Sequence, residues 1–184
     1  TSEILGIGIG VPGPVDENGR INRCVNLNWG VFNLHETLGR MTGLRVRAGN
    51  DANVAALGEA WKGGGEGCRS AVFITLGTGV GGGIIIDGKI YSGSNFAGAE
   101  IGHTVIAVDG PQCACGRKGC FEVFSSATGL IRMTKEAMEA DKDSVMHKIT
   151  AERKGKVTAR TSFDAMRMGD KTAKAVVDLS LIHI

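Results

Sequence analysis

One histidine and three cysteines lie close together in the second half of the chain. They are His103, Cys113, Cys115 and Cys120. Imidazole nitrogen and thiolate sulfur are the ligands that a four-coordinate zinc ion prefers. Two glycines between the cysteines, Gly116 and Gly119, permit the tight backbone turns that would bring three sulfur atoms around one ion. The sequence therefore predicts a structural zinc site made of these four side chains.

Two glutamates flank this group. Glu100 lies just before the histidine, and Glu122 lies just after the last cysteine. The zinc ion would already occupy the histidine and the three thiolates. The two carboxylates would therefore not be zinc ligands, and we interpret them as functional groups that the metal site holds in position. The alternative is a small apolar loop with incidental thiols.

A third carboxylate, Asp51, follows a segment with a strand pattern, residues 44–48. Apolar residues then recur at helical spacing, at Val54, Leu57 and Trp61. Ligands of α/β proteins bind at the carboxyl ends of strands, where this carboxylate would lie. Asn50 or Asp51 is expected to cap the helix. Asp51 therefore has two interpretations, an ordinary N-cap or a functional group.

The segment 77–83 reads Gly-Thr-Gly-Val-Gly-Gly-Gly and connects two expected strands. Successive backbone N–H groups of such a loop can bind an anion such as phosphate. It is not a P-loop, because no Gly-Lys-Ser/Thr follows and a strand comes next. A tight turn alone would need only one or two glycines. We predict phosphate binding by Gly77, Thr78, Gly79, Gly81 and Gly82.

The rest of the chain alternates between strand and helix patterns. Strands are expected at 4–10, 21–25, 44–48, 71–76, 84–86 and 89–91, with a buried strand at 71–76 and a hairpin turn at 87–88. Helices are expected at 31–42, ending at Gly43, then from residue 50 or 51, at 122–140 with a break near Gly129, and around 163–177 with an interruption at 169–170. Residues 142–160 are polar and are expected to hold helix ends and loop.

Residues 62–67 include four glycines and are expected to form a flexible connection and a domain boundary. We therefore expect one part of the fold at 1–62 and another at 68–178. The last six residues, 179–184, match the translation of a sequencing-library adapter, and we leave them out of the fold prediction. His147 and His183 have no neighbouring ligands and are interpreted as ordinary surface residues.

Composition narrows the class of protein. The 184 residues are 42% hydrophobic and 22% charged, as in a soluble globular protein. The formal net charge of +2 is too small to indicate a polyanion partner such as nucleic acid. No apolar run is long enough for a membrane span, and no signal peptide precedes the first strand. Five cysteines, three of them at ligand spacing, fit a reducing cytoplasm better than a disulfide framework.

Several of these motifs resemble signatures of the ROK family of sugar kinases and sugar-responsive repressors. Glu-x-Gly-His is present at 100–103, and Cys-x-Cys-Gly-x2-Gly-Cys-x-Glu is present at 113–122. The Asn-Asp-Ala-Asn segment at 50–53 and the glycine-rich segment are similar to the family's sugar and phosphate elements. The resemblance extends from residue 1 to about 178. Within the family the chain looks most like a bacterial glucokinase, because Ala99 stands where fructokinase-like members usually carry a further histidine.

The resemblance implies an α/β, actin-like ATPase fold with two ribonuclease-H-like lobes and substrates bound in the cleft between them. Residues 1–62 would belong to the N-terminal lobe and residues 68–178 to the C-terminal lobe. The implied reaction is the phosphorylation of a hexose by ATP with Mg²⁺, most simply glucose to glucose 6-phosphate, in the cytoplasm. When complete, such a protein is expected to form a homo-oligomer, a dimer or tetramer.

By the same resemblance, Asp51 is the base, and Asn50, Glu100, His103 and Glu122 hold the sugar. His103 would place one ring nitrogen on zinc and direct the other toward a hydroxyl. Ionised glutamates can only accept hydrogen bonds, which suits sugar hydroxyls as donors. These residues do not separate glucose from mannose or N-acetylmannosamine, nor ATP from another phosphoryl donor.

The family's Asp-x-Gly-Gly-Thr hairpin has no counterpart before Ile4, and the end of its adenosine site has none beyond residue 178. We therefore expect a fragment that is incomplete at both termini and inactive alone. The rival expectation is a repressor of the same family with a helix-turn-helix ahead of residue 1. Asp51 favours the kinase, because a sensor needs no base. A zinc-stabilised binding module without activity is a third interpretation, which the phosphate-type loop argues against.

Overall fold

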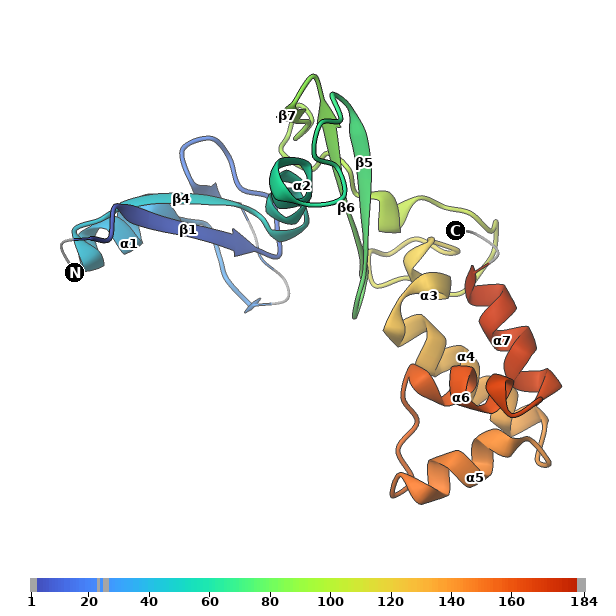
Figure 1. Cartoon of the computed structure of the whole chain (residues 1–184). Coiled ribbons are helices and arrows are strands. Elements are labelled where there is room, and N and C mark those ends of the chain that lie inside the picture. Colours follow the sequence, from blue (N-terminus) through green and yellow to red (C-terminus); the bar gives the residue numbers. More distant parts are fainter. Residues whose placement is uncertain (1–2, 23, 25–26, 182–184) are drawn as a thin grey trace. The chain divides into compact units, whose positions relative to one another are not determined.

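The computed structural model describes the chain except for residues 1–2, 23, 25–26 and 182–184 (Figure 1). The chain divides into two compact units. The first holds Thr1–Thr75 and Gly82–Glu100, and the second holds Leu76–Gly81 and Ile101–Ile184. This division does not coincide with the boundary expected at 62–67, which lies inside the first unit. The end of the strand expected at 21–25, His183 and the last residues of the adapter-like segment lie outside the described residues.

A pair of parallel strands forms the centre of the first unit. β1 (Gly6–Val11) pairs with β4 (Arg45–Asn50), with Gly6 opposite Arg45 and Val11 opposite Asn50. In β1, isoleucine and valine alternate with glycine, so the apolar side chains all lie on one face. Ile9 and Val11 contribute to a core that also contains Val15, Ile21, Cys24 and Leu34.

The helix α1 (Leu34–Thr42) covers this core and begins later than predicted. Residues 32–33 instead form β3 (Phe32–Asn33), which pairs antiparallel with β2 (Arg20–Ile21). The side chain of Asn33 then caps the helix by accepting a backbone N–H of its first turn. Gly43, with φ of 70°, ends the helix as predicted.

The helix α2 (Asp51–Lys62) packs against both parallel strands. Gly10 and Gly49 are paired in the strand register, and both lie close to this helix. A Cβ atom on Gly49 would be 2.9 Å from Cγ1 of Val54, and one on Gly10 would be 3.0 Å from Cγ2 of the same residue. The missing side chains allow the first turn of α2 to approach the strand ends closely. The N-terminus of α2 is thereby fixed at the carboxyl end of β4.

A three-stranded sheet has the order β5 (Ala71–Leu76), β6 (Val80–Ile86), β7 (Lys89–Ile90). Asp87 and Gly88, with φ of 50° and 73°, form the predicted two-residue turn between the antiparallel strands β6 and β7. The hairpin prediction is therefore confirmed.

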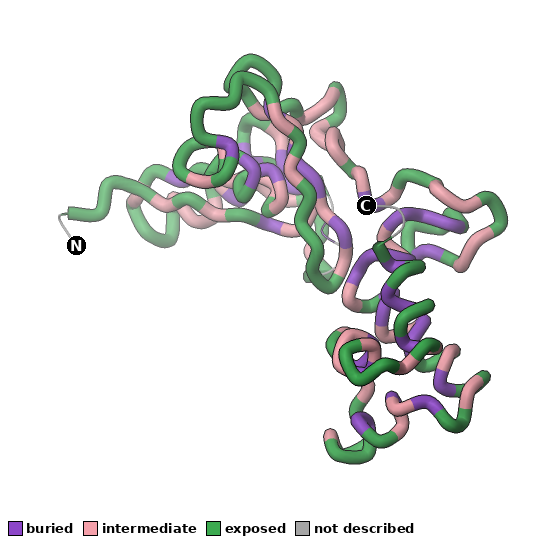
Figure 2. Tube along the Cα trace, turned by 45° about the vertical axis from the view of Figure 1, so that its right-hand side comes forward, coloured by how far each residue is buried: buried purple, intermediate pink, exposed green. Residues whose placement is uncertain are grey.

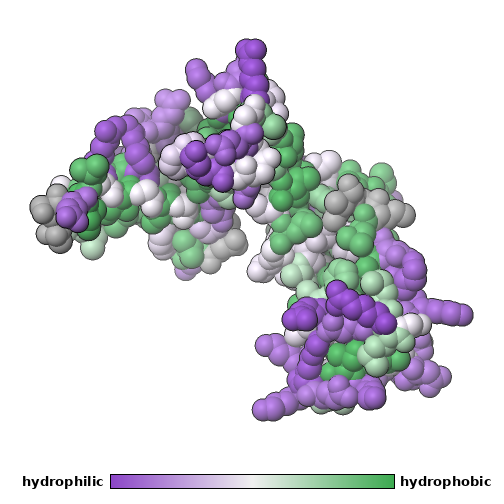
Figure 3. Space-filling view, viewed as in Figure 1, coloured by the Kyte–Doolittle hydropathy of each residue, from purple (hydrophilic) through white to green (hydrophobic). Residues whose placement is uncertain are grey.

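The prediction that β5 is buried is wrong for the described structure. Val72, Ile74 and Leu76 are 61%, 46% and 54% exposed, and hydrophobic side chains follow this strand in Figure 3. Met41 of α1 and Trp61 of α2 are likewise exposed. Local spacing correctly identified β5 as a strand and α1 and α2 as helices. Burial depends on what packs against an element, and local spacing does not encode that.

The second unit is mainly helical. After the 3₁₀ turn η2 (Ile101–His103) come α3 (Glu122–Ser125), α4 (Ala127–Ala140), α5 (Val145–Glu152), α6 (Arg160–Arg167) and α7 (Lys171–Leu181). Their buried positions, purple in Figure 2, form one cluster of Phe124, Leu130, Met133 and Val176 and another of Met138, Met146, Ile149, Ala165 and Ala173. Among the helices that the structure describes, none combines the length and apolar character required to cross a membrane.

Two helix predictions in this unit are corrected. The break expected near Gly129 lies at Ser126, whose backbone is extended and whose hydroxyl accepts the Gly129 N–H at the start of α4. Gly129 itself permits a close approach, because a Cβ there would lie 2.4 Å from the carbonyl oxygen of Val123. Residues 142–160, expected as helix ends and loop, contain α5, which Ser144 caps.

The carboxylate of Asp170 joins the starts of α5 and α7. Its Oδ2 accepts hydrogen bonds from the Ser144 hydroxyl at 2.7 Å and from Val145 N–H at 2.6 Å, and its Oδ1 accepts from Ala173 N–H at 2.7 Å. Burial alone would raise the pKa of Asp170, but these hydrogen bonds outweigh burial and lower it. One side chain thus satisfies backbone donors of two helices.

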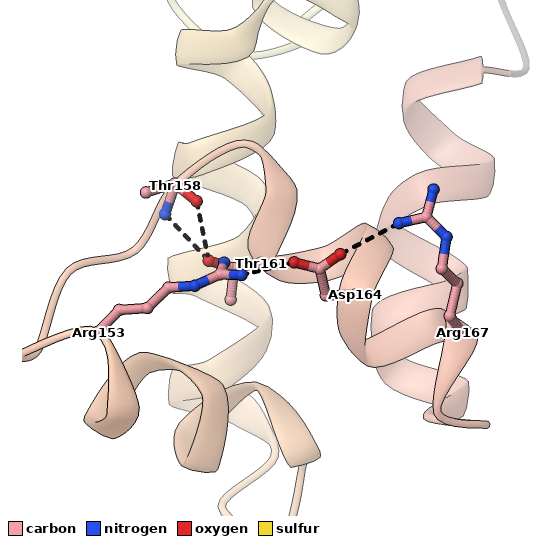
Figure 4. A network of polar contacts seen from close by, with 5 residues as sticks. All are labelled: Arg153, Thr158, Thr161, Asp164 and Arg167. Carbon is pink, nitrogen blue, oxygen red and sulfur yellow. Dashed lines mark hydrogen bonds and ion pairs between the residues drawn. The ribbon is translucent and has the colours of Figure 1, made fainter.

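A second polar network joins α5 to α6 (Figure 4). Asp164 lies between two arginines, 2.6 Å from Nη2 of Arg153 and 3.1 Å from Nη1 of Arg167. The hydrogen bond from Arg153 is the main cause that lowers the pKa of Asp164. The Thr161 hydroxyl accepts the Thr158 N–H at 3.0 Å. These contacts fix the connection between the two helices.

Candidate functional site

The start of α2 settles which of two side chains caps it. Oδ1 of Asn50 accepts the Asn53 N–H at 3.0 Å, so Asn50 is the N-cap. Asp51 is the first residue of the helix, is exposed, and accepts the adjacent Ala52 N–H at 2.8 Å. Its interpretation as an ordinary N-cap is therefore wrong. The carboxylate lies at the carboxyl end of β4 and at the positive end of the helix dipole.

A cavity of about 1010 Å³ lies in the first unit beside Asn50. Its lining includes Ile9, Arg47, Leu57, Tyr91, Ser92 and Phe96. Asn53 also lines it, is 8% exposed, and has an Oδ1 atom without a hydrogen-bond partner among the described residues. A buried amide oxygen of this kind is a position at which a bound donor would be stabilised. Sequence reasoning missed Asn53, although it is the last residue of the Asn-Asp-Ala-Asn segment.

The glycine-rich segment 77–83 divides into a turn and a strand. β6 begins at Val80, so Gly81 and Gly82 lie in a strand and the turn contains only residues 77–79. The expected loop is therefore shorter than predicted. Inside the turn, the Gly77 N–H donates to the Gly79 carbonyl oxygen at 2.9 Å. That N–H group is used within the chain and not presented outward.

The four expected metal ligands lie together in the second unit. Their donor atoms all lie within 4.8 Å of one another. Nδ1 of His103 is 3.6 Å from Sγ of Cys113, and the Sγ atoms of Cys115 and Cys120 are 3.6 Å apart. Around a tetrahedral zinc ion, a nitrogen–sulfur pair would be about 3.6 Å apart and a sulfur–sulfur pair about 3.8 Å apart. The donor set and its spacing therefore fit a four-coordinate zinc site.

Backbone turns hold these thiols in place. Cys113 N–H donates to the Arg117 carbonyl oxygen at 2.8 Å, and Gly116, with φ of 92°, makes the tight turn between them. Hydrogen bonds from the backbone and side chain of Arg117 lower the pKa of Cys115 to about 6. Burial raises the pKa of Cys120 to about 12. A bound cation would favour the thiolate form of both residues.

The remaining candidate side chains surround the metal-ligand group in the sequence. Glu100 is exposed and directly precedes η2. His103 is half-buried, and because its Nδ1 faces Cys113, its Nε2 is the ring nitrogen available to a ligand. Glu122 is the first residue of α3, and its Oε2 accepts the Val80 N–H at 2.9 Å.

The predicted residues divide between the two units. Asn50, Asp51, Gly82 and Glu100 belong to the first unit, and Gly77, Thr78, Gly79, Gly81, His103, the three cysteines and Glu122 belong to the second. Within the second unit, Glu122 contacts Val80, the residue of β6 that directly follows the glycine turn. Glu122 was predicted as a site residue, but its contact with Val80 was not predicted from the sequence.

Comparison with known proteins gives one family. The chain matches the ROK family over residues 1–184. It is 44% identical over 179 residues to a glucokinase of Halalkalibacterium halodurans, covering 96% of this chain and 54% of that protein. It is 40% identical over 174 residues to a glucokinase of Thermotoga maritima, covering 94% and 55%. A putative xylose repressor of Caldicellulosiruptor sp. is 37% identical over 151 residues, covering 81% and 38%. The chain thus spans about half the length of the glucokinases it matches.

Solved structures agree with the sequence comparison. A ROK family glucokinase from Streptomyces griseus in complex with glucose and AMPPNP has a TM-score of 0.82 and 33% identity, covering 97% of this chain and 58% of that one. A ROK family transcriptional regulator, a homolog of the E. coli MLC protein, has a TM-score of 0.83 and 26% identity, covering 96% and 43%. The expected α/β, actin-like ATPase fold is confirmed. The chain belongs to the ROK family.

Proposed function

We propose that the complete protein is a sugar kinase that transfers the γ-phosphoryl group of ATP to a hexose, converting glucose to glucose 6-phosphate. Identity to the two glucokinases, 44% and 40%, exceeds the 37% identity to the repressor. Fold similarity does not discriminate, because the glucokinase and the regulator have TM-scores of 0.82 and 0.83. The position of Asp51 is the observation that favours the kinase.

A sugar hydroxyl is a weak nucleophile, so transfer of a phosphoryl group needs an acceptor for its proton. Asp51 has an exposed carboxylate at the start of α2 and does not cap that helix, since Asn50 does. In this proposal Asp51 accepts the hydroxyl proton as the bond to phosphorus forms. A repressor that only binds sugar has no use for such a base.

Four side chains are proposed to hold the sugar: Asn50, Glu100, His103 and Glu122. Because Oδ1 of Asn50 is occupied by the helix cap, its amide nitrogen is the group that would donate to a sugar oxygen. The two glutamates would accept hydroxyl donors. Leaving one such group unpaired costs about 1–3 kcal/mol, so a hydroxyl of the wrong configuration should be rejected roughly ten- to a hundredfold.

For the nucleotide, we propose contacts from the turn Gly77, Thr78 and Gly79 and from the start of β6 at Gly81 and Gly82. Since the Gly77 N–H is bound to the Gly79 carbonyl oxygen, the N–H groups of Thr78 and Gly79 are the main proposed donors. Backbone donors of this kind, together with Mg²⁺ bound to the ATP, disperse the charge of the transferred group.

We also propose a structural zinc ion on His103, Cys113, Cys115 and Cys120. When bound, it would close the loop between these residues and orient the histidine ring. Nδ1 of His103 faces the thiols, which would leave Nε2 to contact a sugar hydroxyl.

A coupled assay for ADP release by the complete protein tests the proposal. Glucose, mannose and N-acetylmannosamine are compared, and glucose is expected to give the highest kcat/KM. Sugar binding by calorimetry is measured on the same samples. If the protein binds sugar but releases no ADP with any of these three sugars, the result would favour the repressor instead.

A further inference from the structure

We propose that Glu122 is a positioning residue for the nucleotide as well as a sugar ligand, because its carboxylate sets the geometry of residues 77–80, which are the glycine turn and the first residue of β6. This inference rests on the proposed kinase function. It assigns to one side chain a link between the sugar contacts and the phosphate contacts of the same enzyme.

The link begins with a direct hydrogen bond. Oε2 of Glu122 lies 2.9 Å from the backbone nitrogen of Val80, a residue far away in the sequence. The carboxylate also fills the space beside Gly79, where a Cβ atom would lie only 2.3 Å from the same oxygen. Glycine at position 79 therefore leaves room for this contact, and a methyl group there would displace the end of the Glu122 side chain.

The segment that follows Glu122 holds the same turn at two further points. Ala127 N–H donates to the Gly77 carbonyl oxygen at 2.9 Å, and the Thr128 hydroxyl donates to the Thr78 carbonyl oxygen at 2.8 Å. Together with the Val80 contact, these bonds tie both ends of the turn to the starts of α3 and α4. The conformation of the turn is thus determined by residues 122–128.

The position of Glu122 is itself determined by the metal-ligand group. It follows Cys120 closely in the chain, and the intervening Phe121 donates its N–H to the Thr104 carbonyl oxygen at 2.9 Å, next to His103. On the other side, the backbone of the η2 turn lies close to Val80, since a Cβ on Gly102 would be only 2.1 Å from the Val80 carbonyl oxygen. A path of short contacts therefore joins the thiols, Glu122 and the turn.

This arrangement has a chemical consequence. The Val80 N–H is committed to a carboxylate, so a phosphate group cannot use it. The carboxylate has a second oxygen, Oε1, which can accept a sugar hydroxyl while Oε2 holds the turn. Loss of the Glu122 side chain should therefore weaken the binding of both the sugar and the nucleotide, although the two ligands contact different groups of the protein.

The experiment measures Mg²⁺–AMPPNP binding and glucose binding separately by calorimetry in the complete protein. Glu122→Ala should weaken both ligands, by roughly five- to tenfold for AMPPNP, as expected for loss of one ordering hydrogen bond. Glu122→Gln should largely restore AMPPNP binding, because the amide oxygen can still accept the Val80 N–H. The matched control for Glu122→Ala is Thr128→Val, which removes the hydrogen bond to Thr78 but no proposed sugar contact. It should therefore weaken AMPPNP binding and leave glucose binding unchanged.

A double-mutant cycle tests the contact itself. Gly79→Ala should weaken AMPPNP binding in the wild-type background, where the new methyl group meets the Glu122 carboxylate, and should have little further effect in Glu122→Ala. Hydrogen exchange of the Val80 amide should accelerate in Glu122→Ala.

Two outcomes are kept apart. If Glu122→Ala weakens glucose only, with AMPPNP binding and Val80 exchange unchanged, the positioning role is overturned and the kinase proposal stands. If the wild-type protein binds no AMPPNP, the kinase proposal fails, and unchanged exchange of the Val80 amide in Glu122→Ala then overturns the contact as well.

Discussion

Oδ1 of Asn50 lies 3.0 Å from the backbone nitrogen of Asn53, so the residue before Asp51 caps α2. Asn50 and Asp51 have similar capping ability, but they have different roles at the start of this helix. The amide satisfies the helix terminus, and the carboxylate is left exposed at the first helical position. This division makes the role of Asp51 testable without disturbing the helix.

Asp51→Asn keeps the size of the side chain and an oxygen that can accept the Ala52 N–H, but it removes the proton acceptor. In the complete protein we expect turnover to fall by about 10²–10⁴. Glucose affinity should change far less. Coupled ADP release and calorimetry measure the two quantities. Asn50→Ala, which removes the cap together with a proposed sugar contact, should lower the free energy of unfolding by about 0.5–2 kcal/mol. Unchanged turnover in Asp51→Asn would remove this residue from the mechanism.

Elemental analysis of protein purified without chelator should find about one zinc ion per chain, because four ligands complete a tetrahedral structural site. Cys120→Ser should lose the metal and lower the unfolding temperature. Cys68→Ser is the matched control, since Cys68 is an exposed cysteine outside the group and its loss should leave the zinc content unchanged. Protein that contains no zinc under these conditions contradicts the assignment.

Asp170→Ala should destabilise the helical unit, because one carboxylate accepts N–H groups at the starts of both α5 and α7. Loss of a single cap costs about 0.5–2 kcal/mol, so the effect should reach at least that range. Asp178→Ala is the control. This residue forms an exposed pair with Lys174, which is worth about 0.3–0.5 kcal/mol. Urea unfolding at neutral pH compares the variants, and equal losses would argue against the double cap.

The same carboxylate predicts a dependence on pH. The folded pKa of Asp170 is lowered, so its stabilising effect is present above the unfolded value of about 3.9 and is lost as the pH falls through the folded value. The difference in unfolding free energy between wild type and Asp170→Ala should therefore be constant from pH 7 to about 5 and narrow below about 4. A difference that grows on acidification has the wrong sign for this account.

Gly83 and Gly58 should respond to alanine with opposite signs. A Cβ on Gly83 would lie 2.3 Å from Cβ of Ala56, so Gly83→Ala should push α2 away from β6 and cost about 1–3 kcal/mol. Gly58 lies within α2 with open space around it, so Gly58→Ala should stabilise the helix by about 0.5–1 kcal/mol. Thermal unfolding of both variants measures the effect. Destabilisation of similar size in both would mean that close packing is not what position 83 requires.

The metal-ligand group and most elements could be predicted from the sequence because their signals are local. Ligand chemistry is carried by residue type and spacing, and Gly43, Asp87 and Gly88 occupy positions at which backbone conformation restricts the choice of residue.

The sequence predictions that were wrong have a common physical cause. The environment of each of these residues depends on partners that are distant in the sequence. His147 was interpreted as a surface residue, but its Nε2 lies 3.0 Å from the Met138 carbonyl oxygen and 3.1 Å from that of Asp141, at the end of α4. The glycines of segment 77–83 were interpreted together as a loop, whereas Gly79 leaves room for the Glu122 carboxylate and Gly83 leaves room for α2. No pattern within either segment identifies those partners.

The exposure of β5 has a consequence for handling the isolated chain. The segment Ala71–Leu76 contains no charge, proline or glycine, and lies at the edge of the described sheet with Val72 and Ile74 exposed. Such a segment is a template for cross-β stacking between molecules. We expect concentrated solutions of this chain to be lost through thioflavin-positive fibrils, and Ile74→Lys to delay them. A loss of soluble protein without thioflavin fluorescence would show that aggregation proceeds through another surface.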